Sequence, residues 1–80
     1  MSLIPLSVIP PGQKVEIVEL HGGYKFKKKL ADQGIFVGTT LKVSIGGENG
    51  FVKIKMDNTS FGIGIGMAHK IFVSLLEKQN

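Results

Sequence analysis

The densest group of reactive side chains in this sequence is four lysines within five residues, in the stretch HGGYKFKKKLADQGI: Lys25, Lys27, Lys28 and Lys29. Ammonium groups attract anions, so this group could bind the carboxylates of a partner protein or a phosphate. The preceding pair Gly22–Gly23 would expose backbone N–H groups at a helix start, where the helix dipole favours an anion. No P-loop pattern accompanies the pair, and its simpler role is a tight bend from a strand into a helix.

The lysine stretch also has the spacing of an amphipathic helix. Phe26 and Leu30 lie four residues apart and share one stripe, while three of the lysines fall roughly on the opposite side. Asp32 falls among those lysines and can pair with one of them, and Gly34 suits a helix end because glycine adopts the left-handed conformation there. Lysine is rarely buried. The pattern therefore leaves two interpretations open: a binding surface with Tyr24 beside the lysines, or simply the solvated side of a helix.

A second basic group alternates along two expected strands. Lys42 lies on one of them, and Lys53, Lys55 and Phe51 share a face of the next. Ammonium groups beside an aromatic ring are typical of surfaces that bind single-stranded nucleic acid. Exposed lysines on a hairpin also guard against edge-to-edge aggregation, which is the interpretation we favour. Phe51 can equally mark a protein contact or cover the core.

Residues that could catalyse a reaction or bind a metal are few. His21 and His69 are far apart in sequence, and Glu19 is the nearest carboxylate to His21 that could complete an iron site. No serine stands in a Gly-x-Ser-x-Gly elbow. We therefore expect no enzymatic activity, no cofactor and no metal site. The acidic residues are scattered without an obvious catalytic pair: Glu16, Glu19, Asp32, Glu48, Asp57 and Glu77.

Length and composition limit the remaining classes. The 80 residues predict a single domain, 1–80, and the absence of cysteine removes disulfides and thiolate chemistry. The net charge of +4 comes entirely from lysine, so the bidentate phosphate and base contacts that arginine makes are missing, and nucleic acid is not the expected partner. No apolar run is long enough to cross a membrane, and the proline-rich start is a poor signal peptide. We expect a cytoplasmic protein with no membrane insertion.

The elements that must position these residues are short strands between glycine-rich turns. A turn at Pro10–Gln13 precedes the first strand, whose imperfect alternation predicts a bulge or burial on both faces. The pair Asn49–Gly50 predicts a hairpin, and Met67–Lys70 a single helical turn. These features predict a mainly β fold, a small SH3-like barrel of about five strands with one helix inserted between the first two barrel strands. The expected strands are Lys14–Leu20, Thr40–Ile45, Phe51–Met56, Phe61–Gly66 and Ile71–Leu76.

The alternation within these elements also predicts which side chains form the core. Leu41, Val43 and Ile45 are expected on one face of their strand, and Val52, Ile54 and Met56 on one face of the next. The residues assigned to the core are Phe26, Leu30, Ile35, Leu41, Val43, Val52, Ile54 and Ile63.

The order of these features resembles the FeoA family, ferrous iron transport protein A, over roughly Leu3 to Leu75. The shared order is a proline-leucine-serine start, a proline-glycine turn, a strand, a glycine pair, a basic helix and two further glycines. Near the end, MAHKIFV matches the family's Ala-x-x-Ile-x-Val. The basic helix of the family favours arginine, whereas every basic position here is lysine. The matching residues are Pro5–Ser7, Pro11–Gly12, Gly22–Gly23, Lys27–Leu30, Gly34, Gly38, Ala68, Ile71 and Val73.

The resemblance implies an SH3-like barrel that serves as a non-enzymatic cytoplasmic accessory of FeoB, the membrane ferrous-iron transporter with a G-protein domain. It also implies an alternative, because the same fold occurs as the C-terminal domain of some iron-dependent repressors, where it is part of a metal-responsive regulator. The expected partner-binding residues are those of the lysine helix, with the second basic group as a further candidate face: Tyr24, Lys25, Lys27, Lys28, Lys29, Phe51, Lys53 and Lys55.

Overall fold

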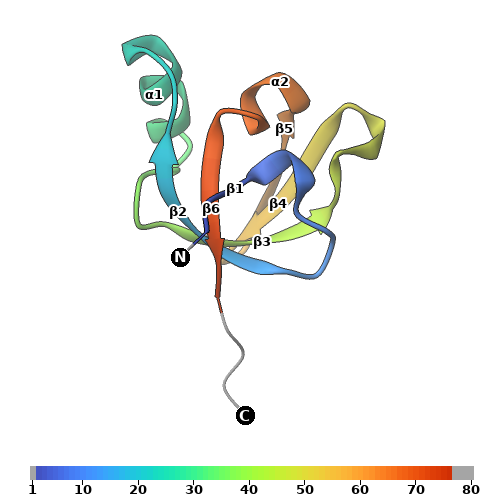
Figure 1. Ribbon diagram of the computed structural model, residues 1–80. Coiled ribbons are helices and arrows are strands. Elements are labelled where there is room, and N and C mark those ends of the chain that lie inside the picture. Colours follow the sequence, from blue (N-terminus) through green and yellow to red (C-terminus); the bar gives the residue numbers. More distant parts are fainter. Residues whose placement is uncertain (1, 77–80) are drawn as a thin grey trace.

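The computed structural model describes residues 2–76 as a six-stranded antiparallel sheet curved into a small SH3-like barrel, with one longer helix at its side (Figure 1). Met1 and residues 77–80, among them Glu77, lie outside the described residues. The elements in chain order are β1 (Ile4–Pro5), the 3-10 helix η1 (Leu6–Val8), β2 (Lys14–Leu20), α1 (Tyr24–Ala31), β3 (Thr40–Ile45), the 3-10 helix η2 (Gly47–Asn49), β4 (Phe51–Met56), β5 (Thr59–Gly64), α2 (Ile65–Ala68) and β6 (Ile71–Leu75).

The strands lie in the order β1-β6-β2-β3-β4-β5, so β2 to β5 follow one another as a meander and β6 inserts between β1 and β2. The five expected strands and the helix between β2 and β3 are present, although the strand expected at Phe61–Gly66 has different bounds. Strand β1 was not predicted, because two residues are too few for alternation to be visible. The pairing of β1 depends on β6, near the other end of the chain, where Ile4 lies opposite Val73.

The imperfect alternation of β2 has the predicted cause. The register of β2 against β6 shifts between Ile17 and Glu19, which is a β-bulge. Val15 and Ile17, before the shift, are fully buried. Leu20, which lies after the shift and on the other face by simple alternation, is still packed against the core. The extra residue therefore lets one strand bury side chains from both nominal faces.

Two expectations from the alternation pattern are wrong. Ile45 was expected to point inward, but the register of β3 against β4 shifts between Val43 and Ile45, and the Ile45 side chain is 39% exposed. The strand expected at Phe61–Gly66 begins earlier, at Thr59, and ends at Gly64, where the chain turns into α2. The helical turn expected at Met67–Lys70 correspondingly lies at Ile65–Ala68.

The core fills the space enclosed by the curved sheet. Phe26 is wrongly assigned to it: the ring is only partly buried and packs against the core from outside, where the Lys70 ammonium lies 5.7 Å from the ring centroid. The other residues assigned to the core are buried as predicted. Among residues 2–76 the buried core residues are Leu6, Ile9, Val15, Ile17, Leu30, Ile35, Leu41, Val43, Val52, Ile54, Ile63, Ala68, Ile71 and Val73.

Candidate functional site

Helix α1 presents its lysines to solvent. Leu30 is the only fully buried residue of the helix, and the lysines and Tyr24 are exposed, with Tyr24 at 76%. Lys28 Nζ lies 3.8 Å from Asp32 Oδ1, as the spacing predicted, but both side chains are more than half exposed and such a pair contributes little stability. Within residues 2–76, the other lysines of α1 have no carboxylate within 4.0 Å. We call Tyr24, Lys25, Lys27, Lys28 and Lys29 the α1 surface.

Close packing explains Gly22 of the glycine pair before α1, whereas a Cβ atom on Gly23 would meet nothing within 4 Å. Gly23 precedes the first helical residue with extended backbone angles, and no side chain caps the helix. A Cβ atom on Gly22 would run into the ring of Phe26. The bend that was the simpler interpretation of the pair is therefore what the structure shows. Gly34 lies beyond the other end of the helix at φ +83°, in the left-handed region expected there.

The second basic group lies on the outer face of the sheet. Phe51, Lys53 and Lys55 are exposed and share one face of β4. The ring of Phe51 rests over Gly62, whose added Cβ would lie 3.3 Å from Phe51 Cδ2. We call Phe51, Lys53 and Lys55 the β4 surface. Helix α1 lies at the opposite side of the barrel, beyond β2 and β6, so the two surfaces do not form one site (Figure 1).

The sheet register adds a residue that the sequence did not reveal. Lys42 lies opposite Lys55, and Lys14 lies opposite Lys42, so three lysines form a row across β2, β3 and β4. Neighbouring strands are about 4.8 Å apart, which keeps these ammonium groups close. Lys14 was missed because its position in the row depends on the pairing of β2 with β3, across an intervening helix.

The two histidines take separate partners. His21 Nε2 lies 2.6 Å from Glu19 Oε1, and the His21 ring stacks on Phe72 with centroids 4.3 Å apart. His69 Nδ1 lies 2.7 Å from Ser7 Oγ. The fold brings their loops together, since the His21 N–H donates to the Lys70 carbonyl at 2.8 Å. Even so, no three metal-binding side chains cluster in residues 2–76.

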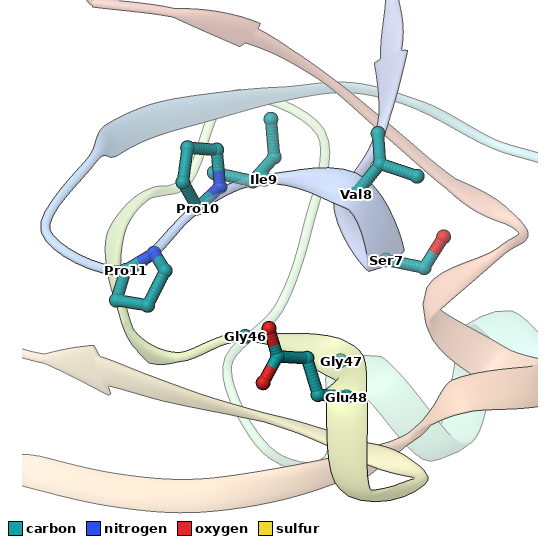
Figure 2. A pocket seen from close by; sticks show the side chains of 8 residues that line it. All are labelled: Ser7, Val8, Ile9, Pro10, Pro11, Gly46, Gly47 and Glu48. Atoms are coloured by element: carbon teal, nitrogen blue, oxygen red, sulfur yellow. The ribbon is translucent and has the colours of Figure 1, made fainter.

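An open hollow of about 380 Å³ lies between the segment Ser7–Pro11 and the turn Gly46–Glu48 (Figure 2). The carboxylate of Glu48 lies on the side that faces the proline rings, while the Ser7 hydroxyl points away from the hollow. One carboxylate beside apolar rings offers neither a nucleophile and base pair nor a phosphate cradle. Sequence reasoning did not find this hollow, because its walls are far apart in the chain.

No helix of residues 2–76 is long and apolar enough to cross a membrane. Residues 4–75 match the family model of the FeoA domain.

The chain belongs to the FeoA family.

A relative from Methanocaldococcus jannaschii, named "Putative Fe(2+) transport protein A", is 34% identical over 71 residues, which cover 89% of this chain and 85% of the relative. The crystal structure of an iron uptake regulatory protein, FeoA, is 32% identical, covers 94% of this chain and 100% of its own, and superposes with a TM-score of 0.86. The chain is thus similar to FeoA proteins in both sequence and structure.

A manganese-dependent transcriptional repressor shares the same fold, with a TM-score of 0.82 at 18% identity over 92% of this chain and 42% of the repressor. The crystal structure of T. acidophilum IdeR has a TM-score of 0.83 at 18% identity, covering 94% of this chain and 35% of that chain. At that identity the likeness concerns the fold alone. The FeoA assignment therefore connects this chain to ferrous iron transport, and the repressor likeness adds no role.

Proposed function

We propose that this FeoA-family chain is a small cytoplasmic accessory protein of ferrous iron uptake that binds the cytosolic part of the FeoB transporter and does no catalysis. The observation that carries the proposal is the α1 surface. Its lysines other than Lys28 have no carboxylate within 4.0 Å among residues 2–76, and Tyr24 is 76% exposed one helical turn before Lys27 and Lys28. An exposed aromatic ring beside unpaired cations is a suitable surface for an acidic partner.

The two kinds of side chain would contribute differently to binding. Exposed lysines mainly raise the association rate and make it sensitive to salt, because they steer an acidic surface towards them over a Debye length. Tyr24 offers a rigid ring with a polar tip, the type of residue that contributes affinity at the centre of an interface. Removing the lysines should therefore slow association, and removing the ring should speed dissociation.

The test is an NMR titration of the labelled protein with the purified cytosolic G-domain region of its FeoB, with and without GTP. We expect shifts clustered on residues 24–29. The double variant Lys25→Glu, Lys29→Glu should weaken binding, while the matched double variant Lys53→Glu, Lys55→Glu tests whether the β4 surface takes part. The α1 assignment would be contradicted if no shifts appeared at high concentrations of the G-domain region. It would also be contradicted if every charge-reversed variant lost binding equally, including one outside both surfaces, such as Lys14→Glu.

A second candidate function, nucleic-acid binding, is favoured only by the lysine row Lys14–Lys42–Lys55. Such binding would fall steeply with salt, because each neutralised phosphate releases a counterion. Phe51, on the same face of β4 as Lys55, already packs on Gly62 and is only 37% exposed, so it is a poor stacking platform. Retention on single-stranded DNA that is lost when all three lysines are replaced by glutamine would support this function over the first.

A further inference from the structure

Strand β5 (Thr59–Gly64) is an unprotected edge of the sheet. It is the last strand in the sheet order, and within residues 2–76 no backbone hydrogen bond reaches it from a strand other than β4. Proteins usually protect such edges with charged residues, prolines or bulges. The other edge, β1, is only two residues long and includes Pro5, whereas β5 has the sequence TSFGIG, with no charge, no proline and a regular register against β4.

The outer face of β5 is almost bare. Its outward residues are Ser60, Gly62 and Gly64, which lie opposite Lys55, Lys53 and Phe51 of β4 respectively. A Cβ atom on Gly64 would meet nothing within 4 Å, and one on Gly62 would meet only the ring of Phe51. Because a lysine side chain has a long, flexible stem, the ammonium groups of β4 can extend across β5 to whatever lies beyond it.

The lysines beside this edge have no counterpart among the described residues. Lys53 and Lys55 are exposed, and within residues 2–76 neither has a carboxylate within 4.0 Å. They are two residues apart on one strand, so their Cα atoms are about 6.8 Å apart. Carboxylates at alternate positions of a strand added beside β5 have the same spacing. Each of two such carboxylates can therefore pair with one of the two lysines across β5.

We propose that β5 accepts an extended acidic segment of a partner protein as a seventh strand, paired by its backbone to the free edge, with alternate carboxylates turned towards Lys53 and Lys55. Strand addition of this kind takes affinity from main-chain hydrogen bonds and specificity from alternate side chains. A second copy of the chain fits this edge less well, since it would bring further lysines to the same face of a protein whose net charge is +4. The proposal holds for any protein that supplies such a segment, so it is independent of binding to FeoB.

The probe is a synthetic eight-residue peptide with glutamate at alternate positions and threonine or valine between them, titrated into the labelled protein. We expect amide shifts and slowed hydrogen exchange in Thr59–Gly64. Replacing glutamate by glutamine in the peptide should weaken binding roughly 2- to 30-fold, as expected for two exposed ion pairs. The double change Lys53→Glu, Lys55→Glu in the protein should weaken it at least as much, because it replaces attraction by repulsion. The matched double change Lys25→Glu, Lys29→Glu gives a protein with the same net charge as the Lys53→Glu, Lys55→Glu variant. It should leave peptide binding unchanged.

A second variant tests the path across β5. Gly62→Val places a side chain between Lys53 and the added strand. We expect this variant to weaken binding of the acidic peptide more than binding of the glutamine peptide. Amide spectra of β2 and β6 report whether the barrel stays folded. The proposal would be overturned if the shifts were confined to residues 24–29, or if millimolar peptide caused no shifts. It would also be overturned if the two peptides bound equally, or if an oligonucleotide displaced the peptide through Lys14 and Lys42. Broadening of β5 that depends on protein concentration without peptide would instead assign the edge to a second copy.

Discussion

Lys42 on β3 lies directly opposite Lys55 on β4, so two like charges face each other across neighbouring strands. Like charges in this position destabilise a sheet, and Lys14 extends the repulsion by standing opposite Lys42 on its other side. A central lysine between two others is the least favourable position in the row. The barrel is therefore less stable than its hydrophobic core would allow.

Replacing Lys42 with threonine should stabilise the protein. We expect the free energy of unfolding, measured by denaturant titration at low salt, to rise by about 0.2–1 kcal/mol. The gain should shrink in 1 M salt, where charges are screened beyond about 3 Å. Lys53→Thr is the matched control, because it makes the same change of strand propensity at a position opposite Gly62. Equal gains in the two variants at both salt concentrations would mean that repulsion is not the cause.

Leu30 anchors α1 to the barrel. It is the one residue of the helix that is completely buried, so Leu30→Ala should lower the free energy of unfolding by about 2–5 kcal/mol through lost burial and a residual cavity. Thermal and denaturant unfolding give the value. Lys29→Ala, on the exposed side of the same turn, should change stability by less than about 0.5 kcal/mol. An unchanged melting temperature for Leu30→Ala would refute the packing of the helix.

Gly47 lies where two segments approach closely. A Cβ atom there would lie 2.8 Å from the Ser7 carbonyl oxygen and 2.6 Å from Ile65 Cδ1, so Gly47→Ala forces a shift of the backbone as well as of a side chain. We expect a loss of about 1–3 kcal/mol in unfolding free energy. At the neighbouring Gly46 the nearest atom is Pro11 Cδ at 3.5 Å, so Gly46→Ala should be close to neutral. Similar losses at both positions would contradict the close approach.

The hydrogen bond between Ser7 and His69 connects η1 to the turn before β6. Ser7 is 9% exposed and its hydroxyl lies 2.7 Å from His69 Nδ1. Ser7→Ala should cost about 0.5–1.5 kcal/mol of stability and shift the ¹⁵N signals of the His69 ring. Ser60→Ala, at an exposed position of β5, is the control. Unmoved His69 signals in the Ser7 variant would show that the bond does not persist in solution.

Most of the barrel could be predicted from local patterns, because alternation and turn residues act over a few positions. The β2 bulge was visible in the placement of Val15, Ile17, Val18 and Leu20. The bulge that exposes Ile45 was not, since it depends on how β3 meets β4, and alternation alone favoured an inward side chain. Register between strands is decided by packing of the whole sheet rather than by any single segment.

The candidate surfaces were predicted in part for the same reason. Exposure of the lysines on α1 follows from helical spacing, and exposure of Phe51, Lys53 and Lys55 from strand alternation. Which of these residues lie together in space does not follow from either pattern. The lysine row needs the pairing of β2 with β3, and the open edge at β5 needs the complete order of the sheet. Neither is encoded within a short window of sequence.

The position of β6 between β1 and β2 has a consequence for how the protein is made. Val15 of β2 pairs with Leu75 of β6, and Ile4 of β1 pairs with Val73, so both early strands need a partner that is synthesised after β5. The meander from β2 to β5 can pair as it emerges from the ribosome, but the barrel closes only once β6 has left the exit tunnel. Until β6 emerges, the apolar face of β2 is therefore open to chaperones.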